Sequence, residues 1–280
     1  MNIENALNNA VKILKKSKIK NSILDSEILL SQAINRDRKY IFLNSKENLK
    51  QKYSKNFNNL IARRRKGEPI AYLINKKEFW KESFYVDQNV LIPRPDTEVL
   101  VEEIMKLYDK QKKLSILDVG TGSGCIIISI LKERQKFRGT AIDISKKALN
   151  IAKYNAKIHH LSNRIKFYKS SVDNFFKHKY DLIVSNPPYI SRLKIKYLDK
   201  DILGFEPIQA LEGGIDGFNV FSKIVKKSSM LLKVGGKLVL EIGFDQKFEM
   251  LKLLKKYNFF VNKIVKDYGG RDRCVISTKL

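Results

Sequence analysis

Cysteine and long apolar runs are both scarce in this sequence. Cys125 and Cys274 are the only cysteines among 280 residues, too few for a disulfide scaffold or a thiolate metal site. No apolar run approaches the roughly 18–20 residues that a bilayer-spanning helix needs. The first 17 residues alternate polar and apolar side chains with helical spacing, which is not the pattern of a signal peptide. These absences predict a cytoplasmic protein with no membrane anchor and no bound metal.

Acidic residues are also scarce relative to basic ones. The chain has 55 Lys and Arg against 29 Asp and Glu, a formal net charge of +26. Residues 1–75 carry 16 basic and 6 acidic residues (+10), and residues 76–280 carry 39 and 23 (+16). The first segment is therefore the denser in charge, which indicates weak contact with an anionic partner such as ribosomal RNA. Lysine supplies 43 of the basic residues, however, and arginine is the residue favoured for forked contacts to phosphate. Compositional drift in a chain rich in Lys, Asn and Ile explains the charge as well, so both explanations stay open.

The first part of the chain shows only helical periodicity. Apolar side chains recur at helical spacing in four segments. These segments are residues 3–17, 24–34, 40–43 and 47–66. Gly67 then stands where a helix C-terminal cap is expected, and the run Arg63-Arg64-Arg65 before it predicts a solvated helix end. Residues 1–75 are therefore predicted to form a small all-helical domain.

Residues 76–93 change to a β-prone composition. Two short runs of aromatic and β-branched residues flank Asp87-Gln88-Asn89, which predicts a linking β-hairpin with its turn at those three residues. A helix is expected next, with Pro95 in its first turn and Thr97 or Asp96 as its cap. These residue types alone show no chemistry.

Strands and helices alternate from residue 115 onward. The predicted strands are residues 116–119, 139–144, 165–168, 181–184 and 237–242, followed by an antiparallel pair at 259–267 and 273–278. The helices between them are predicted at residues 125–134, 146–158, 217–232 and 246–257. This alternation is typical of an α/β fold with a doubly wound, mostly parallel sheet, here over residues 94–280.

A glycine-rich loop follows the first of these strands. It reads Gly120-Thr121-Gly122-Ser123-Gly124 and leads directly into a helix, so a ligand can approach the backbone closely there. Cys125 occupies the offset at which pyrophosphate binding uses a third glycine, which favours a nucleoside ligand without a pyrophosphate. Asp143 ends the second strand, 19 residues after Gly124, where a carboxylate can accept hydrogen bonds from both ribose hydroxyls.

The stretch Asn186-Pro187-Pro188-Tyr189 follows the fourth strand. The two prolines stop the strand and stiffen the backbone at the sheet edge where α/β folds bind ligands. Asn186 Oδ1 and the Pro187 carbonyl are both acceptors, so together they can hold the two hydrogens of a planar NH₂ group. Tyr189 can stack on the flat group that carries it. The stretch therefore predicts a binding site for an amide or an aromatic amine.

No strong base is expected beside this turn. His159, His160 and His178 sit in polar surroundings on or beside predicted helices, and we expect all three at the surface.

Taken together, the loop 120–124, Asp143 and the turn 186–189 resemble the class I S-adenosylmethionine methyltransferases that modify planar nitrogens. Further blocks across the chain resemble the HemK/PrmC family more narrowly. These blocks are residues 67–72, 78–80, 91–98, 205–207 and 267–273. The resemblance implies a Rossmann-like seven-stranded catalytic domain, a hairpin link and a helical domain that grips the substrate. It also implies S-adenosylmethionine as cofactor, class I peptide chain release factors as partners, and N5 methylation of the glutamine in their Gly-Gly-Gln motif.

The resemblance also implies roles for single residues. Gly120, Thr121, Gly122, Ser123 and Gly124 are expected to cradle the methionine part of the cofactor. Asp143 is expected to bind its ribose, and Val172 to flank its adenine. Asn186 is expected to touch cofactor and substrate, while Pro187, Pro188 and Tyr189 complete the site for the glutamine amide, with Asn186, Pro187 and Tyr189 as the catalytic residues.

Two positions depart from the family pattern. Asn75 stands where relatives often have Gly, which is tolerable because Asn enters positive φ more easily than most residues. Ser171 stands where relatives often have Asp, with Asp173 only two residues on, and this leaves the adenine contact open.

Two other functions stay open. A nucleic-acid adenine N6-methyltransferase would present the same flat NH₂ to the turn, although such enzymes usually carry a large target-recognition region and groove contacts from aromatic and arginine side chains. A non-catalytic RNA-binding protein would explain the charge. It would not explain a cofactor loop and an amide site at the ends of neighbouring strands.

Overall fold

The computed structural model describes residues 1–177 and 179–280, so the predicted surface position of His178 lies outside the described residues. The chain divides into two compact units. The helical unit comprises Met1–Lys76 and Asp199–Phe205, and the sheet unit comprises Lys77–Leu198 and Glu206–Leu280. No helix in the described part of the chain combines the length and the apolar composition that crossing a bilayer requires.

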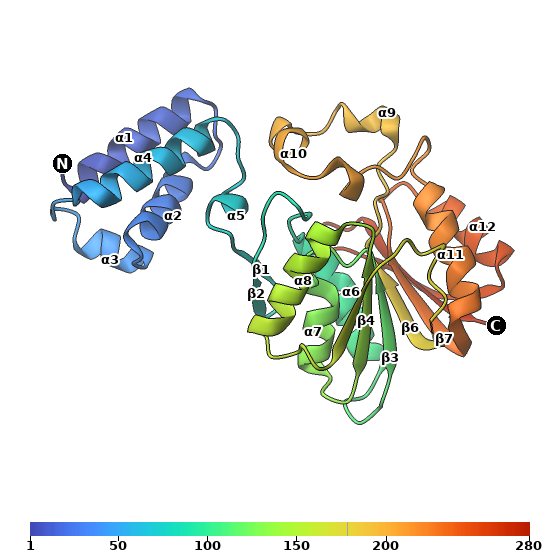
Figure 1. The fold of residues 1–280 in the computed structure, drawn as a ribbon. Coiled ribbons are helices and arrows are strands. Elements are labelled where there is room, and N and C mark those ends of the chain that lie inside the picture. The colour runs from blue at the N-terminus through green and yellow to red at the C-terminus, as the bar shows by residue number, and fades with distance from the viewer. Residues whose placement is uncertain (178) are drawn as a thin grey trace. The chain divides into compact units, whose positions relative to one another are not determined.

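The helical unit contains the predicted N-terminal helices. They are α1 (Ile3–Lys16), α2 (Ser22–Ile34), α3 (Arg38–Leu43) and α4 (Gln51–Arg65), drawn in blue to cyan in Figure 1. The unit also contains α5 (Ile70–Leu73) and α10 (Lys200–Phe205), which the sequence did not predict. Their apolar faces meet in one core, in which Leu14, Leu29 and Leu30 are fully buried. Gly67 follows α4 at φ +98°, as expected of a residue that ends a helix.

The predicted solvated helix end was wrong at Arg64 alone, since Arg63 and Arg65 are exposed as expected. Arg64 is not part of a solvated helix end, because its side chain is only 12% exposed. Its Nε donates to Asp25 Oδ2 at 2.8 Å, and its Nη1 lies 3.3 Å from Asp201 Oδ2 on α10. Arg64 therefore joins α2 and α10 to the end of α4.

The sheet unit is built around seven strands in the order β5-β4-β3-β6-β7-β9-β8. They are β3 (Ser115–Val119), β4 (Arg138–Asp143), β5 (Ile165–Lys169), β6 (Tyr180–Ser185), β7 (Leu232–Glu241), β8 (Phe259–Lys266) and β9 (Asp272–Lys279). Strands β3 to β7 pair in parallel, and β9 is antiparallel to both β7 and β8. The predicted mostly parallel sheet and its final antiparallel pair are confirmed.

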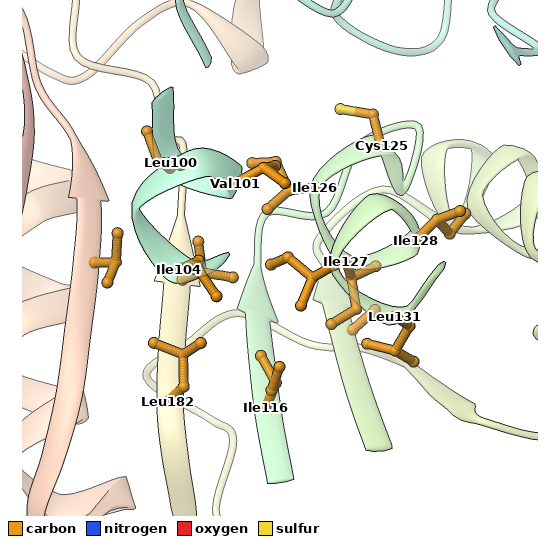
Figure 2. Packing of buried hydrophobic residues seen from close by; sticks show 14 of the residues in the cluster. Leu100, Val101, Ile104, Ile116, Cys125, Ile126, Ile127, Ile128, Leu131 and Leu182 are labelled. Atoms are coloured by element: carbon orange, nitrogen blue, oxygen red, sulfur yellow. The ribbon is translucent and has the colours of Figure 1, made fainter. Parts of the chain in front are cut away.

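Alternate residues of each central strand face opposite helical layers. Ile116 on β3 and Leu182 on β6 belong to the core beneath α6 (Glu98–Leu107) and α7 (Cys125–Glu133), as Figure 2 shows. Their neighbours Leu117 and Ile183 belong to the second core with α11 (Asn219–Leu231) and α12 (Lys247–Lys256). Helix α8 (Lys146–Ile158) connects β4 to β5. Burial on both faces explains why these strands read as continuous apolar runs.

The strand register places the predicted site residues at one edge of the sheet. Val119 at the end of β3 pairs with Ile142 on β4 and with Ser185 on β6. The residues that follow these three therefore emerge side by side at the carboxyl edge. They are Gly120, Asp143 and Asn186.

Two local predictions in this unit were wrong. The hairpin lies at β1 (Lys77–Phe79) and β2 (Glu82–Phe84), with Trp80 at φ +57° in its turn, and not around residues 87–89. Phe79 and Phe84 are both fully buried with ring centroids 6.2 Å apart, so burial across the pair decided the register and overrode the local turn signal. Strand β7 likewise begins at Leu232, and its pairing with β6 shifts register around Gly235-Gly236.

The connection from residue 190 to 216 also contains structure that the sequence did not predict. Besides α10 it holds α9 (Arg192–Ile195) and the short 3₁₀ helix η2 (Ile208–Ala210). A second 3₁₀ turn, η1 (Pro95–Thr97), precedes α6.

Candidate methyltransferase site

A cavity of about 520 Å³ opens at the carboxyl edge of the sheet. Nine of the predicted site residues line it: Gly120, Thr121, Gly122, Ser123, Asp143, Val172, Asn186, Pro187 and Pro188. All described lining residues belong to the sheet unit. The structure does not place Gly124 or Tyr189 in the described lining.

The glycine-rich loop leaves room for a ligand at two of its glycines. Gly120 and Gly122 have φ of +72° and +55°, and a Cβ added to either would meet no atom within 4 Å. Gly124 has another task. A Cβ there would lie 3.0 Å from Ile128 Cδ1 and 3.3 Å from Ala152 Cβ, so this glycine allows α7 and α8 to pack closely.

Asp143 occupies the end of β4 beside this loop. Its Oδ2 accepts from the Gly122 N–H at 3.0 Å and its Oδ1 from the Ser145 N–H at 2.8 Å. Burial raises the pKa of its carboxyl, while these backbone donors lower it. Each oxygen keeps a second lone pair, so the carboxylate can still accept from two ligand hydroxyls.

The turn after β6 carries two acceptor oxygens that receive no hydrogen bond from the described residues. Asn186 Nδ2 donates to Thr97 Oγ1 at 3.0 Å. Neither Asn186 Oδ1 nor the Pro187 carbonyl accepts a hydrogen bond from any described residue. Both residues line the cavity, so the role of these two oxygens in holding a planar NH₂ group stays a prediction that this placement allows.

A buried polar network lies behind this turn. Thr97 Oγ1 donates to Glu241 Oε2 at 2.6 Å, and the Tyr189 hydroxyl donates to Glu241 Oε1 at 3.2 Å. Arg273 Nη1 donates in turn to the Tyr189 hydroxyl at 3.3 Å, and Asp267 Oδ2 accepts from both Nε and Nη2 of Arg273 at 3.0 Å. Burial raises the pKa of Glu241 to about 7 and that of Tyr189 further above its usual range.

Comparison with known proteins gives the family. Residues 5–74 match the PrmC N-terminal domain family, and residues 95–203 match the methyltransferase small domain family. A release factor glutamine methyltransferase of Buchnera aphidicola subsp. Acyrthosiphon pisum is 40% identical over 279 residues, which cover 100% of this chain and 99% of that protein. One of Buchnera aphidicola subsp. Schizaphis graminum is 42% identical, with 100% of both chains covered. The chain belongs to the release factor glutamine methyltransferase family.

A solved structure confirms the fold class. The crystal structure of a methyltransferase from Pyrococcus furiosus matches with a TM-score of 0.54 and 17% identity, over 70% of this chain and 88% of that one. At that identity the likeness shows the fold alone. This chain therefore shares the fold of its sheet unit with that methyltransferase.

Asp118 lies next to the site, and the sequence did not indicate a role for it. Asp118 is 1% exposed, its Oδ2 accepts from Thr121 Oγ1 at 2.7 Å, and its Oδ1 has no partner among the described residues. Burial raises the pKa of this carboxyl to about 7. The available signal was an acidic side chain inside an otherwise apolar strand.

Thr97 was predicted as a possible helix cap, and this was wrong. Its side chain makes no capping hydrogen bond at the start of α6, because the hydroxyl is engaged by Glu241 and Asn186. Thr97 lines the cavity instead.

Glu206 is a second residue for which the sequence did not indicate a role. Its buried carboxylate accepts from Arg94 Nη2 at 2.6 Å and from the Ile92 N–H at 3.2 Å. These bonds join two of the blocks that resemble the release factor glutamine methyltransferases.

The adenine side of the predicted cofactor site contains Val172, which is 8% exposed. Ser171 and Asp173 line the cavity beside it, and Lys223 Nζ lies 3.4 Å from Asp173 Oδ2. The structure thus brings both candidate polar residues to this end of the cavity.

Tyr189 packs its ring against the second core, and its stacking role stays a prediction.

The surface position predicted for His159 was wrong. Its side chain is 9% exposed, with Nδ1 3.2 Å from Glu82 Oε2 and Nε2 3.0 Å from the Ser83 carbonyl. It supports the hairpin β1–β2, whereas His160 is exposed as predicted.

Cys125 lines the cavity, but burial raises the pKa of its thiol to about 12, so it supplies no thiolate near neutral pH. Within the described residues no group of three or more His, Cys, Asp or Glu side chains could hold a metal ion.

Proposed function

We propose that this chain transfers a methyl group from S-adenosylmethionine to the side-chain nitrogen (N5) of the glutamine in the Gly-Gly-Gln motif of class I peptide chain release factors. The observation that carries the proposal is that Asn186 and Pro187 line the cavity while Asn186 Oδ1 and the Pro187 carbonyl accept no hydrogen bond from the described residues. A primary carboxamide offers two hydrogens in one plane, which is the complement of that pair.

The cavity residues fit the proposed cofactor. Gly120 and Gly122 carry no side chain where a ligand would approach, and the Asp143 carboxylate keeps lone pairs for two ribose hydroxyls. Val172, with Ser171 and Asp173 beside it, would flank the adenine. When bound, the cofactor supplies an electrophilic methyl group on a sulfonium.

The chain's own contribution is orientation. An amide nitrogen is a poor nucleophile because its lone pair is delocalised into the carbonyl. Two acceptors on the NH₂ push electron density toward nitrogen and hold it in a fixed position, and fixed orientation can supply several kcal/mol of barrier reduction. No base is required for the attack, since the proton becomes acidic only once the nitrogen carries the methyl group. The methyl–sulfur bond would break as the methyl–nitrogen bond forms, and one amide proton would then pass to water. Asn186 Oδ1 and the Pro187 carbonyl would orient the NH₂ group and keep no proton.

The domain roles belong to the same proposal. Residues 1–75 would hold the release factor, residues 76–93 would link the parts, and residues 94–280 would carry out the transfer. Because release factors act on ribosomes, the proposal also implies a cytoplasmic location. The net charge of +26 supports weak, salt-sensitive contact with RNA near that substrate.

The decisive experiment offers the purified protein and labelled S-adenosylmethionine three substrates in parallel: a class I release factor, total RNA and double-stranded DNA. We expect label in the release factor alone, with mass spectrometry placing a gain of one methyl on the Gly-Gly-Gln peptide. A release factor with that glutamine replaced by alanine serves as the matched control. Label in RNA or DNA would support the adenine N6-methyltransferase alternative. Absence of label from all three substrates would contradict the proposal.

A further inference from the structure

We propose that Glu241 is a positioning residue that sets the direction in which the Asn186 amide faces, acting through the hydroxyl of Thr97. The proposal rests on the function proposed above and deepens it. It concerns which atom of Asn186, Oδ1 or Nδ2, is offered to the substrate.

The Thr97 hydroxyl has only one proton to donate. Glu241 Oε2 lies 2.6 Å from Thr97 Oγ1 and carries no proton when ionised, so that proton points to Glu241. Thr97 Oγ1 must then act as an acceptor toward Asn186, whose Nδ2 lies 3.0 Å away. This commits the NH₂ group of Asn186 to Thr97 and leaves Oδ1 free.

The free oxygen is what the amide site requires. If the Asn186 side chain were turned over, its NH₂ group would face the substrate NH₂, and two donors cannot hydrogen-bond to each other. The two orientations of an isolated carboxamide have almost the same shape. A neighbour of fixed polarity is therefore needed to select one of them, and Thr97 has that polarity only while Glu241 accepts its proton.

Glu241 is held as an acceptor from its other side as well. Its Oε1 accepts from the Tyr189 hydroxyl at 3.2 Å, and that hydroxyl accepts from Arg273 Nη1 at 3.3 Å. The hydrogen bonds thus run inward from both ends, from Arg273 through Tyr189 and from Asn186 through Thr97, to one carboxylate. Glu241 is 2% exposed and is not among the described residues that line the cavity, so it acts through Thr97 and not on the substrate.

A purely structural network would give a different result on mutation. If the network only stabilised the fold, removing the Thr97 hydroxyl would lower the unfolding temperature and leave turnover per folded molecule unchanged. If it orients Asn186, turnover falls while binding of the cofactor is retained.

The test compares Thr97→Val, which keeps the shape but lacks the hydroxyl, with Thr97→Ser, which restores the hydroxyl. We expect Thr97→Val to lower kcat on the release factor by about 10- to 100-fold, with the KM for S-adenosylmethionine changed by less than about 3-fold. Thr97→Ser should recover kcat to within about 3-fold of the wild type. Ser277→Ala, which removes another buried hydroxyl of the same unit, on β9, is the control and should leave kcat unchanged. Equal kcat for Thr97→Val and the wild type, or equal loss in Thr97→Val and Thr97→Ser, would overturn the proposal.

A second measurement does not depend on activity. The side-chain NH₂ of Asn186, observed by ¹⁵N NMR, should exchange its protons with water more slowly in the wild type than in Thr97→Val and Glu241→Gln. Unchanged exchange in both variants contradicts the orientation. If the wild type fails to methylate release factors but shows this protection, the function proposed above is wrong and the orientation of Asn186 stands.

Discussion

Glu241 and Asp118 are carboxyl groups that the fold buries at 2% and 1% exposure. Burial raises the pKa of each to about 7. A carboxyl whose pKa is raised by folding binds its proton more tightly in the folded state. Its contribution to stability is therefore complete below the pKa of the unfolded chain and is lost as the pH rises through about 7.

The first prediction follows for Glu241→Gln, which is neutral at every pH. At pH 8 this variant should have a free energy of unfolding higher than that of the wild type by about 2 kcal/mol, and the gain should shrink toward pH 5. Urea unfolding at the two pH values measures it. Turnover should fall in the same variant, because Thr97 no longer has a carboxylate to accept its proton. The wild-type kcat should rise with pH around 7, and this rise should be absent from Glu241→Gln.

The charged and titratable groups around Glu241 come from several elements. They are Asp96 on η1, Tyr189 after β6, Arg273 and Cys274 on β9, and Cys125 on α7. Burial raises the pKa of both thiols and of the tyrosine, and Arg273 stays protonated, so none of these four changes charge near pH 7. A transition near pH 7 that persists in Glu241→Gln would therefore belong to a group other than Glu241, and burial also raises the pKa of Asp118 and of Asp143.

The second prediction concerns Asn186→Ala. Because Oδ1 is one of only two acceptors for the amide, its removal should lower kcat by roughly 100-fold, as misplacement of a reacting group commonly does. Affinity for S-adenosylmethionine, measured by calorimetry, should fall only a few-fold, since the glycine loop and Asp143 remain. Equal losses in affinity and in turnover would assign Asn186 to the cofactor alone.

At the scale of elements, two glycines of the loop 120–124 have different roles: Gly124 allows α7 and α8 to pack closely, and Gly122 lines the cavity. The third prediction compares Gly124→Ala with Gly122→Ala. Both positions have positive φ, at +82° and +55°, so both variants carry a backbone cost of about 1–2 kcal/mol. Only Gly124→Ala also brings a methyl group to 3.0 Å from Ile128 and 3.3 Å from Ala152.

Thermal unfolding and cofactor titration should therefore rank the two variants in opposite orders. We expect Gly124→Ala to lose the more stability, because α7 and α8 must move apart, and Gly122→Ala to lose the more cofactor affinity, because Gly122 lines the cavity. The same order in both measurements would contradict this division.

The elements that the sequence predicted are those with local causes. Most central strands contain a short apolar run and each helix over the sheet has its own periodicity, so the order of these elements followed from short windows, although β7 begins at Leu232 and not at Lys237. The loop 120–124, Asp143 and the turn 186–189 were predictable because each directly follows such a strand, and parallel strands bring their carboxyl ends to one edge.

The elements that the sequence missed depend on distant partners. Thr97 is bound by Glu241, 144 residues further along the chain, and by Asn186, 89 residues away. No local pattern reports contacts of that separation, so the block around Thr97 read as an ordinary helix start. The predicted position of the hairpin was wrong for the same reason, since the burial of Phe79 and Phe84 outweighed the turn preference of residues 87–89.

At the scale of the whole molecule, the predicted chemistry and the chain's densest charge belong to different units. The described lining of the cavity lies entirely in the sheet unit, whereas residues 1–75 carry a net charge of +10. The cofactor should therefore stabilise the two units unequally.

Hydrogen exchange measures this last prediction. S-adenosylhomocysteine at 100 times its Kd should stabilise the folded sheet unit by about 2.7 kcal/mol. Exchange should slow at residues 119–124, 142–145, 170–173 and 185–186, which line or adjoin the cavity. Exchange in α1, α2 and α4 should stay unchanged, because none of their described residues lines it. Comparable slowing in these three helices would mean that cofactor binding reaches the helical unit and that the two units do not respond separately.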